Sequence, residues 1–459
     1  MTISAIPVLP ERVALATLLL ISTAASASST LWVKNNGADS NGCGAATTPC
    51  RSIGQAIENA ADGDTIEVGA GFYGDVSGAG TFTGPGDEHA QRLRNSSGCI
   101  VCITKAVRIF SLHGAAQTVI QGQSSDTGQF LTTVLIAHDG VTFGTQDHGF
   151  TLRGGNIYGV QIDTNVDFNT LPFSVVAGIR VGGNVDIGDR TAFEYDGPMW
   201  SDNPCRNCIY RGQISWLDNE AIGNGASGFA IRLGQYDREP VLLQGNLAQG
   251  GGGTGFLVAP GPSSQDGLDK DTAGSVALVN NTATANGLGF DANSTGDIRG
   301  NVAVGNSQAG FILVPNGGSF SGNNAVGNGG PGVIVNFSKD TDSPIIDPTI
   351  PIPTFHTFSH NNFFGNDRNR PVITLSFGGP VFNPGPGAHC GVLNVGALSG
   401  PAGLFDNPHP GPPVHLVAAN NFWGSAHGPS PTGPGDAVGG ACDENNATTT
   451  GIPFSAVGF

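Results

Sequence analysis

The stretches Asn301-Val-Ala-Val-Gly-Asn306 and Asn323-Asn-Ala-Val-Gly-Asn328 are two copies of one motif, which recurs between Ile214 and Val335. Each copy places an asparagine at its start and a glycine or asparagine at its end. These residues tolerate the left-handed backbone conformations of tight turns. The motif therefore predicts a short segment held between two corners of the chain. Earlier copies begin at Asn219, Asn246 and Asn281.

A glycine followed by a large apolar residue lies eight or nine residues after each of these asparagines. The spacing between copies is looser and varies from 20 to 35 residues. A fixed motif with connections of variable length is typical of a solenoid, whose coils are regular and whose loops vary. The pairs are Gly228-Phe229, Gly255-Phe256, Gly289-Phe290, Gly310-Phe311 and Gly332-Val333.

The segments between the corners have the two-residue period of β-strands. In Gly228-Phe-Ala-Ile-Arg-Leu233, the residues Phe229, Ile231 and Leu233 fall on one side of a half-buried strand. Helices are a poor alternative, because 72 glycines and 29 prolines among 459 residues interrupt helical periodicity. Coils stacked about 4.8 Å apart would pair every strand and bury the inward side chains. We therefore expect the phenylalanines to form one interior file, with an asparagine ladder beside it.

The chain resembles the right-handed parallel β-helix proteins of the pectin-lyase-like superfamily. Besides the repeats, the resemblance rests on Trp32-Val33, on Gly63-Asp-Thr-Ile-Glu-Val68 and on Asn420-Asn-Phe-Trp-Gly-Ser-Ala-His-Gly-Pro-Ser430. It covers nearly the whole chain after residue 27 and is specific for the fold. It implies an all-β, right-handed parallel β-helix solenoid with an N-terminal capping helix. The sequence Ser52-Ile-Gly-Gln55 matches a capping box and predicts that helix, which can cover the open end of the first coil.

Length and charge limit the organisation and the partners. A solenoid grows along one axis, so we expect a single domain over residues 28–459 and a monomer. Within it we expect the first strand and helix over 28–63, an insertion over 185–208 and irregular C-terminal coils over 382–459. The formal net charge of −17 excludes nucleic acid as a partner, because nucleic acid needs a basic footprint. Neutral glycans remain open, as do acidic glycans where a local basic patch or bridging Ca²⁺ exists.

The N-terminus has the pattern of an export signal. Arg12 precedes an apolar run from Val13 to Thr23, and Ala25-Ser-Ala27 offers a cleavage site. That run is too short to span a membrane. We expect residues 1–27 to be a signal peptide, no membrane span, and a secreted or periplasmic mature chain.

The eight cysteines suit an oxidising compartment. We expect a local disulfide between Cys43 and Cys50, and a C-terminal one between Cys390 and Cys442. The other four form two Cys-x-x-Cys pairs, which could each close on themselves, pair with one another or bind zinc. Disulfides are favoured over zinc, because the pairs are much farther apart than in compact zinc sites. These four are Cys99, Cys102, Cys205 and Cys208.

Stacked coils would also align the outward residues of the strands. We expect Gln161, Asp163, Arg180, Arg232 and Asp291 to lie on one exposed sheet face. The resemblance implies that such a face binds oligosaccharide, and that a lyase would use arginine as a base with Ca²⁺ on carboxylates. Asp163, Arg180 and Arg232 are therefore the catalytic candidates, and Gln161 and Asp291 are binding candidates. An ordinary solvated face with ion pairs between coils is the simpler alternative.

Two aromatic residues of the expected insertion complete the candidate site. Tyr195 and Trp200 offer flat surfaces for sugar rings, unless the loop packs them onto the solenoid. Ca²⁺ is the candidate cofactor, and the sequence identifies no metal ligands. We therefore expect an exported β-helix that binds polysaccharide, with lyase cleavage of a uronate-containing glycan as the candidate activity. The alternative is a non-catalytic surface, adhesion or carbohydrate-binding module.

Overall fold

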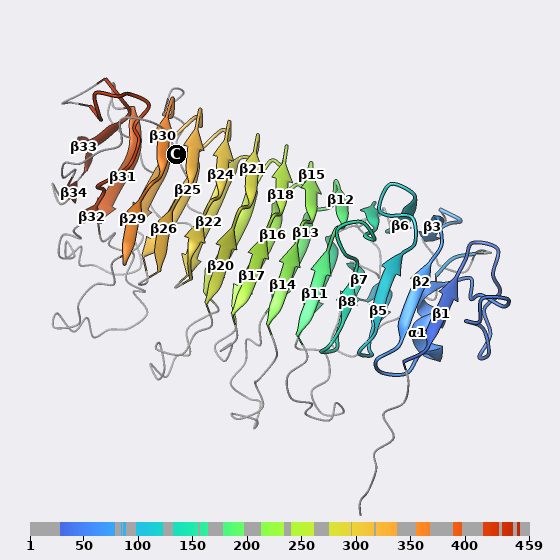
Figure 1. Cartoon of the computed structure of the whole chain (residues 1–459). Coiled ribbons are helices and arrows are strands. Elements are labelled where there is room, and N and C mark those ends of the chain that lie inside the picture. Colours follow the sequence, from blue (N-terminus) through green and yellow to red (C-terminus); the bar gives the residue numbers. More distant parts are fainter. Residues whose placement is uncertain are drawn as a thin grey trace, which may run out of the picture.

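The computed structural model describes residues 28–78, 84, 86–88, 98–122, 132–154, 157–163, 178–196, 213–233, 240–260, 275–294, 296–315, 318–336, 355–367, 389–396, 416–430, 434–443 and 448–449. These residues form short parallel strands in three long sheets, with one helix at the N-terminal end. The coils follow one another in sequence order along a single axis (Figure 1). The fold is a right-handed parallel β-helix, as the sequence predicts.

Sheet A contains eleven parallel strands, each hydrogen-bonded to the strand of the next coil. Alternate residues point inward and outward, so that Val181 is buried while Arg180 is exposed. The strands are β1 (Thr30–Val33), β2 (Thr65–Val68), β5 (Arg108–Ser111), β8 (Thr142–Phe143), β11 (Ile179–Gly182), β14 (Ile214–Leu217), β17 (Val241–Gln244), β20 (Val276–Val279), β23 (Ile298–Arg299), β26 (Ser319–Ser321) and β29 (Thr357–Ser359).

Sheet B contains ten shorter strands, most of which place only their middle residue in the core. Alanine occupies that inward position in five successive coils, from Ala221 to Ala325. The strands are β3 (Gly71–Gly74), β6 (Thr118–Gln121), β9 (Thr151–Arg153), β12 (Val185–Ile187), β15 (Glu220–Ile222), β18 (Leu247–Gln249), β21 (Thr282–Thr284), β24 (Val302–Val304), β27 (Asn324–Val326) and β30 (Asn362–Phe364).

Sheet C contains eleven longer strands and carries the glycine-phenylalanine motifs. A separate pair, β32 (Leu416–Val417) and β34 (Thr448–Thr449), lies near the C-terminus. The strands of sheet C are β4 (Cys99–Ile103), β7 (Thr132–Ile136), β10 (Tyr158–Asp163), β13 (Thr191–Asp196), β16 (Ser227–Leu233), β19 (Thr254–Pro260), β22 (Leu288–Ser294), β25 (Phe311–Pro315), β28 (Val333–Asn336), β31 (Cys390–Gly396) and β33 (Ala437–Asp443).

The expected interior file of phenylalanines is confirmed. The rings of Phe229, Phe256, Phe290 and Phe311 are fully buried and stack with centroids 4.7 Å apart. Phe193 of the preceding coil extends the file, with its centroid 4.8 Å from that of Phe229. The spacing equals the rise of one coil, so each ring lies directly over the next.

An asparagine ladder follows the corner between sheets A and B, as expected. The backbone N–H of Asn281 donates to Oδ1 of Asn301 at 2.9 Å, and that of Asn301 donates to Oδ1 of Asn323 at 2.9 Å. Each buried side chain thus pairs backbone groups that the corner leaves without a strand partner. The ladder comprises Asn184, Asn219, Asn246, Asn281, Asn301, Asn323, Asn361 and Asn421.

A second ladder follows the corner between sheets B and C. Asn286, Asn306, Asn328 and Asn366 repeat the same bonding. Asp436 ends this ladder, because its carboxylate accepts from the N–H groups of Gly365 and Asn366, each at 3.1 Å. Burial, the largest influence, raises the pKa of Asp436 above its ordinary value.

Helix α1 (Ile53–Asn59) confirms the predicted N-terminal helix. Ser52 is its N-cap, and the hydroxyl of Ser52 accepts from the N–H of Gln55 at 3.1 Å. A residue distant in sequence completes this end, since the buried carboxylate of Glu88 accepts from the N–H groups of Ile53 and Gly54. Burial raises the pKa of Glu88 to about 7, although these two donors oppose the rise.

The disulfides agree with the local pairings expected from the sequence. Cys43 binds Cys50, and Cys390 binds Cys442, joining β31 to β33. Cys99 and Cys102 close on themselves within β4, which decides between the alternatives for that pair. Cys205 and Cys208 lie outside the described residues.

The expectation of an insertion beginning at residue 185 is wrong. Residues 185–187 form β12 and residues 191–196 form β13, and both strands pair with the coils before and after them. The regular coil continues because Asn184 occupies the first ladder and Phe193 enters the phenylalanine file. Residues 197–208 lie outside the described part of the chain.

The expected signal peptide, residues 1–27, also lies outside the described residues. In the part of the chain that the structure covers, no helix has the length and apolar character needed to cross a membrane. The division into a signal peptide and one domain stays a prediction.

Candidate functional site

Four of the five outward-facing candidates lie in sheet C. Gln161 and Asp163 belong to β10, Arg232 to β16 and Asp291 to β22. Backbone register places Asp163, Asp196 and Arg232 at consecutive positions of one column. Gln161 and Asp291 belong to the neighbouring column of the same face.

The expectation that Arg180 shares this face is wrong. Arg180 lies in β11 of sheet A, where it is paired in register with Thr142 and Ser215. It precedes the ladder residue Asn184 by four positions, which puts it in the strand before the corner, whereas Arg232 lies in the strand after the second corner. The two arginines therefore lie in different sheets.

The outer face of sheet C is less open than expected. The side chains of Gln161 and Asp291 are buried, with exposed fractions of 8% and 5%. Their column also contains Leu135, Ala230 and Ile312, which are buried as well. Neither Gln161 nor Asp291 can therefore meet a ligand directly in this arrangement.

A chain of polar side chains crosses four coils on this outer face. The hydroxyl of Thr132 donates to Oε1 of Gln161 at 2.8 Å, and Nε2 of Gln161 donates to Oε2 of Glu194 at 3.4 Å. Nη1 of Arg232 donates to Oε1 of Glu194 and forms an ion pair with it. The chain joins β7, β10, β13 and β16. Its two middle members, Gln161 and Glu194, occupy a column in which the flanking coils carry Leu135 and Ala230.

Exposure within this polar network is confined to one end. The side chain of Glu194 is fully buried, whereas that of Arg232 is 38% exposed. A buried carboxylate is costly unless a cation and hydrogen bonds compensate it, and Arg232 and Gln161 supply both. The result is a guanidinium held in a fixed position at the surface, which is a useful arrangement for binding a polar ligand.

The aromatic candidates are not placed beside this network. Tyr195 points into the solenoid, is 1% exposed and lies in register with Ile162 and Ile231. Its expected role in stacking on sugars is therefore wrong. Trp200 lies outside the described residues, so its role stays a prediction.

Two further buried carboxylates lie at the corner between sheets B and C. Asp186 occupies the inward position of β12 that alanine fills in later coils, and Asp189 occupies the position of the second ladder. The Asn224 amide donates to Oδ1 of Asp186 at 2.7 Å and to the backbone carbonyl of Asp189 at 3.1 Å. Burial, followed by the neighbouring Asp189 carboxylate, raises the pKa of Asp186 well above its ordinary value.

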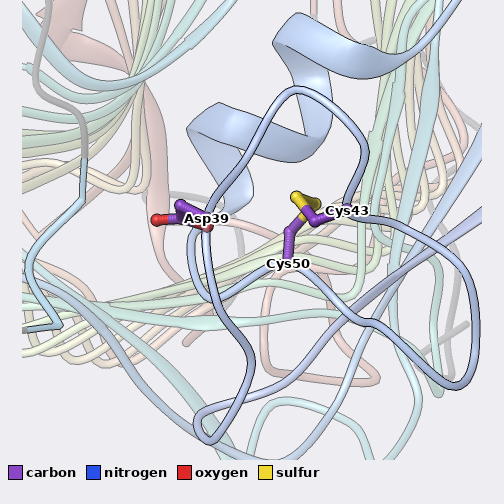
Figure 2. A group of neighbouring side chains, drawn as sticks. All are labelled: Asp39, Cys43 and Cys50. Atoms are coloured by element: carbon purple, nitrogen blue, oxygen red, sulfur yellow. A yellow bond between two sulfur atoms is a disulfide. The ribbon is translucent and has the colours of Figure 1, made fainter.

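One group of side chains has the proximity of a metal site, but it lacks the chemistry. Asp39, Cys43 and Cys50 lie together near α1, and Figure 2 shows the two sulfurs joined as a disulfide. A disulfide offers no thiolate to a metal. The Asp39 carboxylate instead accepts from the N–H groups of Arg51 and Ser52, at 2.8 and 2.9 Å. The group is therefore structural.

Sequence reasoning missed the importance of Glu194. Glu194 falls within residues 185–208, where the sequence predicts an insertion instead of a regular coil. The sequence does contain a signal for a regular coil at this position. Nine residues separate Asn184 from Phe193, as nine separate Asn281 from Phe290. In that coil Glu194 directly follows the phenylalanine, as Ala230 follows Phe229, and so points outward.

A rhamnogalacturonan lyase gives a structural match with a TM-score of 0.36 and 12% sequence identity, covering 73% of this chain and 87% of that one. A similarity at this level carries no argument about activity. No family model matches the chain, and no curated protein matches it.

Proposed function

We propose that this chain is an exported β-helix that binds polysaccharide on the outer face of sheet C, next to Arg232. The observation that supports this proposal is the polar network ending in a half-exposed guanidinium. Glu194 is buried on the outside of the solenoid, where most coils carry apolar residues, and its pairing fixes the orientation of Arg232.

The chemistry of the pair suits sugar hydroxyls. A guanidinium held by a carboxylate keeps several N–H donors in one plane, and adjacent hydroxyls of a sugar can accept from two of them. Because Glu194 already neutralises Arg232, the pair offers hydrogen bonds more than net charge. It therefore favours neutral or weakly charged glycans at this site.

Cleavage by β-elimination is the second candidate function. Backbone register places Asp163 and Asp196 in the same column as Arg232, and carboxylates there are suited to Ca²⁺ and a uronate. The ion pair with Glu194 counts against a basic role for Arg232, since it stabilises the protonated guanidinium. Binding without cleavage is therefore the function that the geometry favours.

Binding is tested with the purified mature chain on an array of neutral and acidic oligosaccharides. For the ligand that binds best, we expect Arg232→Gln to weaken binding about tenfold or more, the loss of one or two charge-assisted hydrogen bonds. Arg190→Gln is the matched control, because Arg190 is also exposed but lies in the turn between β12 and β13. Equal losses of affinity in both variants, or no loss in either, would show that Arg232 does not contact the ligand.

Elimination is tested separately. The wild-type chain is incubated with a panel of polyuronates and Ca²⁺, and the ultraviolet absorbance of the unsaturated product is followed. Product formation that stops in Arg232→Gln would establish the second candidate. If no polyuronate gives unsaturated product while glycan binding is retained, the non-catalytic function is supported.

A further inference from the structure

The three sheets differ sharply in charge. The strands of sheet C contain the carboxylates Asp163, Glu194, Asp196, Asp291 and Asp443 against the single arginine Arg232. The strands of sheet A contain the reverse, with three arginines and one carboxylate, Glu67. The whole chain has 36 acidic and 19 basic residues, so a basic sheet face is exceptional in it.

All three arginines of sheet A point to solvent. Arg108, Arg180 and Arg299 are exposed, and each lies on the outward side of its strand. Within the described residues, none of their guanidinium groups has an ion pair or a side-chain hydrogen bond. This distinguishes them from Arg232, whose charge is already compensated by Glu194.

Register fixes the spacing of the first two arginines. Arg108 pairs with Thr142, and Thr142 pairs with Arg180, so the two arginines lie in one column two coils apart. Two coils correspond to about 10 Å along the solenoid axis. That distance is comparable to the separation of the acidic groups on alternate sugars of an extended polyuronate. The half-buried ring of Phe110 lies beside Arg108 on the same face of β5.

The third arginine lies farther along the same face. Arg299 is four coils beyond Arg180 and in the adjacent outward column, as the pairing through Leu217, Gln244 and Val279 shows. It lines an open groove of about 610 Å³ where glycines replace larger side chains at the corner of sheets A and B.

We propose that the outer face of sheet A is a second binding surface, which takes an acidic polysaccharide lying parallel to the solenoid axis. The ligand class follows from three uncompensated guanidinium groups, which pair with carboxylates or sulfate esters. The single arginine in the strands of sheet C is already paired with Glu194, so sheet A is the face that attracts such a chain. This inference extends the proposed function in naming acidic glycans, and it concerns a different face.

The test compares Arg108→Gln/Arg180→Gln with the wild-type mature chain. The probes are polygalacturonate, dextran sulfate and neutral dextran, with affinities measured by calorimetry at low and at physiological salt. We expect the wild type to bind at least one of the two acidic polymers and to bind it more tightly than dextran. We expect the double variant to lose about tenfold in affinity for each arginine removed. Added salt should weaken the wild-type interaction, because the contacts are exposed and ionic.

The two acidic probes distinguish carboxylate from sulfate as the recognised group, and preference for either supports the proposal. Arg190→Gln again serves as the control and should bind like the wild type. An unchanged affinity in the double variant would overturn the proposal, as would wild-type binding to neither acidic polymer. Equally tight binding of duplex DNA would overturn the assignment to glycans.

The result for the sheet A surface can be distinguished from the result for the site next to Arg232 on sheet C. Arg232 is intact in the double variant, so binding of neutral oligosaccharides should persist there. Conversely, Arg232→Gln should leave polygalacturonate affinity unchanged. Failure of one proposal therefore leaves the other standing.

Discussion

The ring of Phe229 lies on the ring of Phe256 with centroids 4.7 Å apart and an angle of 4° between their planes. This near-parallel stacking continues through Phe290 and Phe311. It forces successive coils into one register, because a ring displaced along its strand would lose contact with both neighbours. The positions of the outward residues, including Arg232 and the arginines of sheet A, follow from that register.

Removing one ring from the middle of the file should destabilise the chain strongly. We expect Phe256→Ala to lower the free energy of unfolding by about 3–5 kcal/mol, through lost burial and the cavity left between two rings. Phe72→Ala is the control, since Phe72 is 49% exposed, and it should cost less than about 1 kcal/mol. Denaturant unfolding followed by circular dichroism measures both values. Similar losses in the two variants would contradict the role of the file.

The asparagine ladder should be equally sensitive to truncation. Oδ1 of Asn301 accepts from the backbone N–H and the side chain of Asn281, and its Nδ2 donates to the carbonyl of Leu278 at 2.8 Å. We expect Asn301→Ala to cost about 2–4 kcal/mol, because several buried polar groups lose their partners. The exposed Gln249 provides a control, and Gln249→Ala should change stability by less than about 0.5 kcal/mol. A ladder variant as stable as the control would show that water replaces the amide at no cost.

The buried Asp186 should make stability depend on pH. Its pKa in the folded chain is raised above the ordinary value of 3.8, so the folded state holds this proton more tightly than the unfolded state does. The contribution of Asp186 to stability is therefore largest at low pH and falls as the pH rises above about 4. We expect Asp186→Asn to flatten this decline and to be more stable than the wild type at about pH 8, by about 1–3 kcal/mol.

The exposed carboxylate of Asp147 provides the matched control for that measurement. Asp147→Asn should show the pH profile of the wild type when unfolding is followed between about pH 4 and about pH 8. If the free energy of unfolding falls with pH at the same slope in Asp186→Asn and in the wild type, then Asp186 is charged at little cost in the folded chain.

The repeating core could be predicted from the sequence, because its residues are few in kind and fixed in spacing. The offset between Asn301 and Gly310 sets one corner and one strand, and the same offset recurs in neighbouring coils. The capping helix could also be predicted, because Ser52 and Gln55 form a local N-cap signal. These features depend on short-range geometry, which sequence spacing encodes directly.

The candidate site could be predicted only in part. Two-residue alternation groups the candidates of sheet C. Assigning Arg180 to its sheet requires counting positions relative to Asn184, whose coil precedes the recognisable glycine-phenylalanine repeats. The coil containing Tyr195 was hidden because Ala192 replaces the usual glycine and Asp189 replaces the usual asparagine. The burial of Gln161 and Asp291 was not predictable, because two-residue alternation shows which way a side chain points and not what covers it.

The most direct test of glycan binding next to Arg232 is hydrogen exchange measured with and without the best-bound oligosaccharide. If the proposal is right, exchange should slow in peptides containing β13 and β16, next to Glu194 and Arg232, and should be unchanged in the strands of sheet B. Protection confined to sheet B, or no protection anywhere at a saturating ligand concentration, would contradict it.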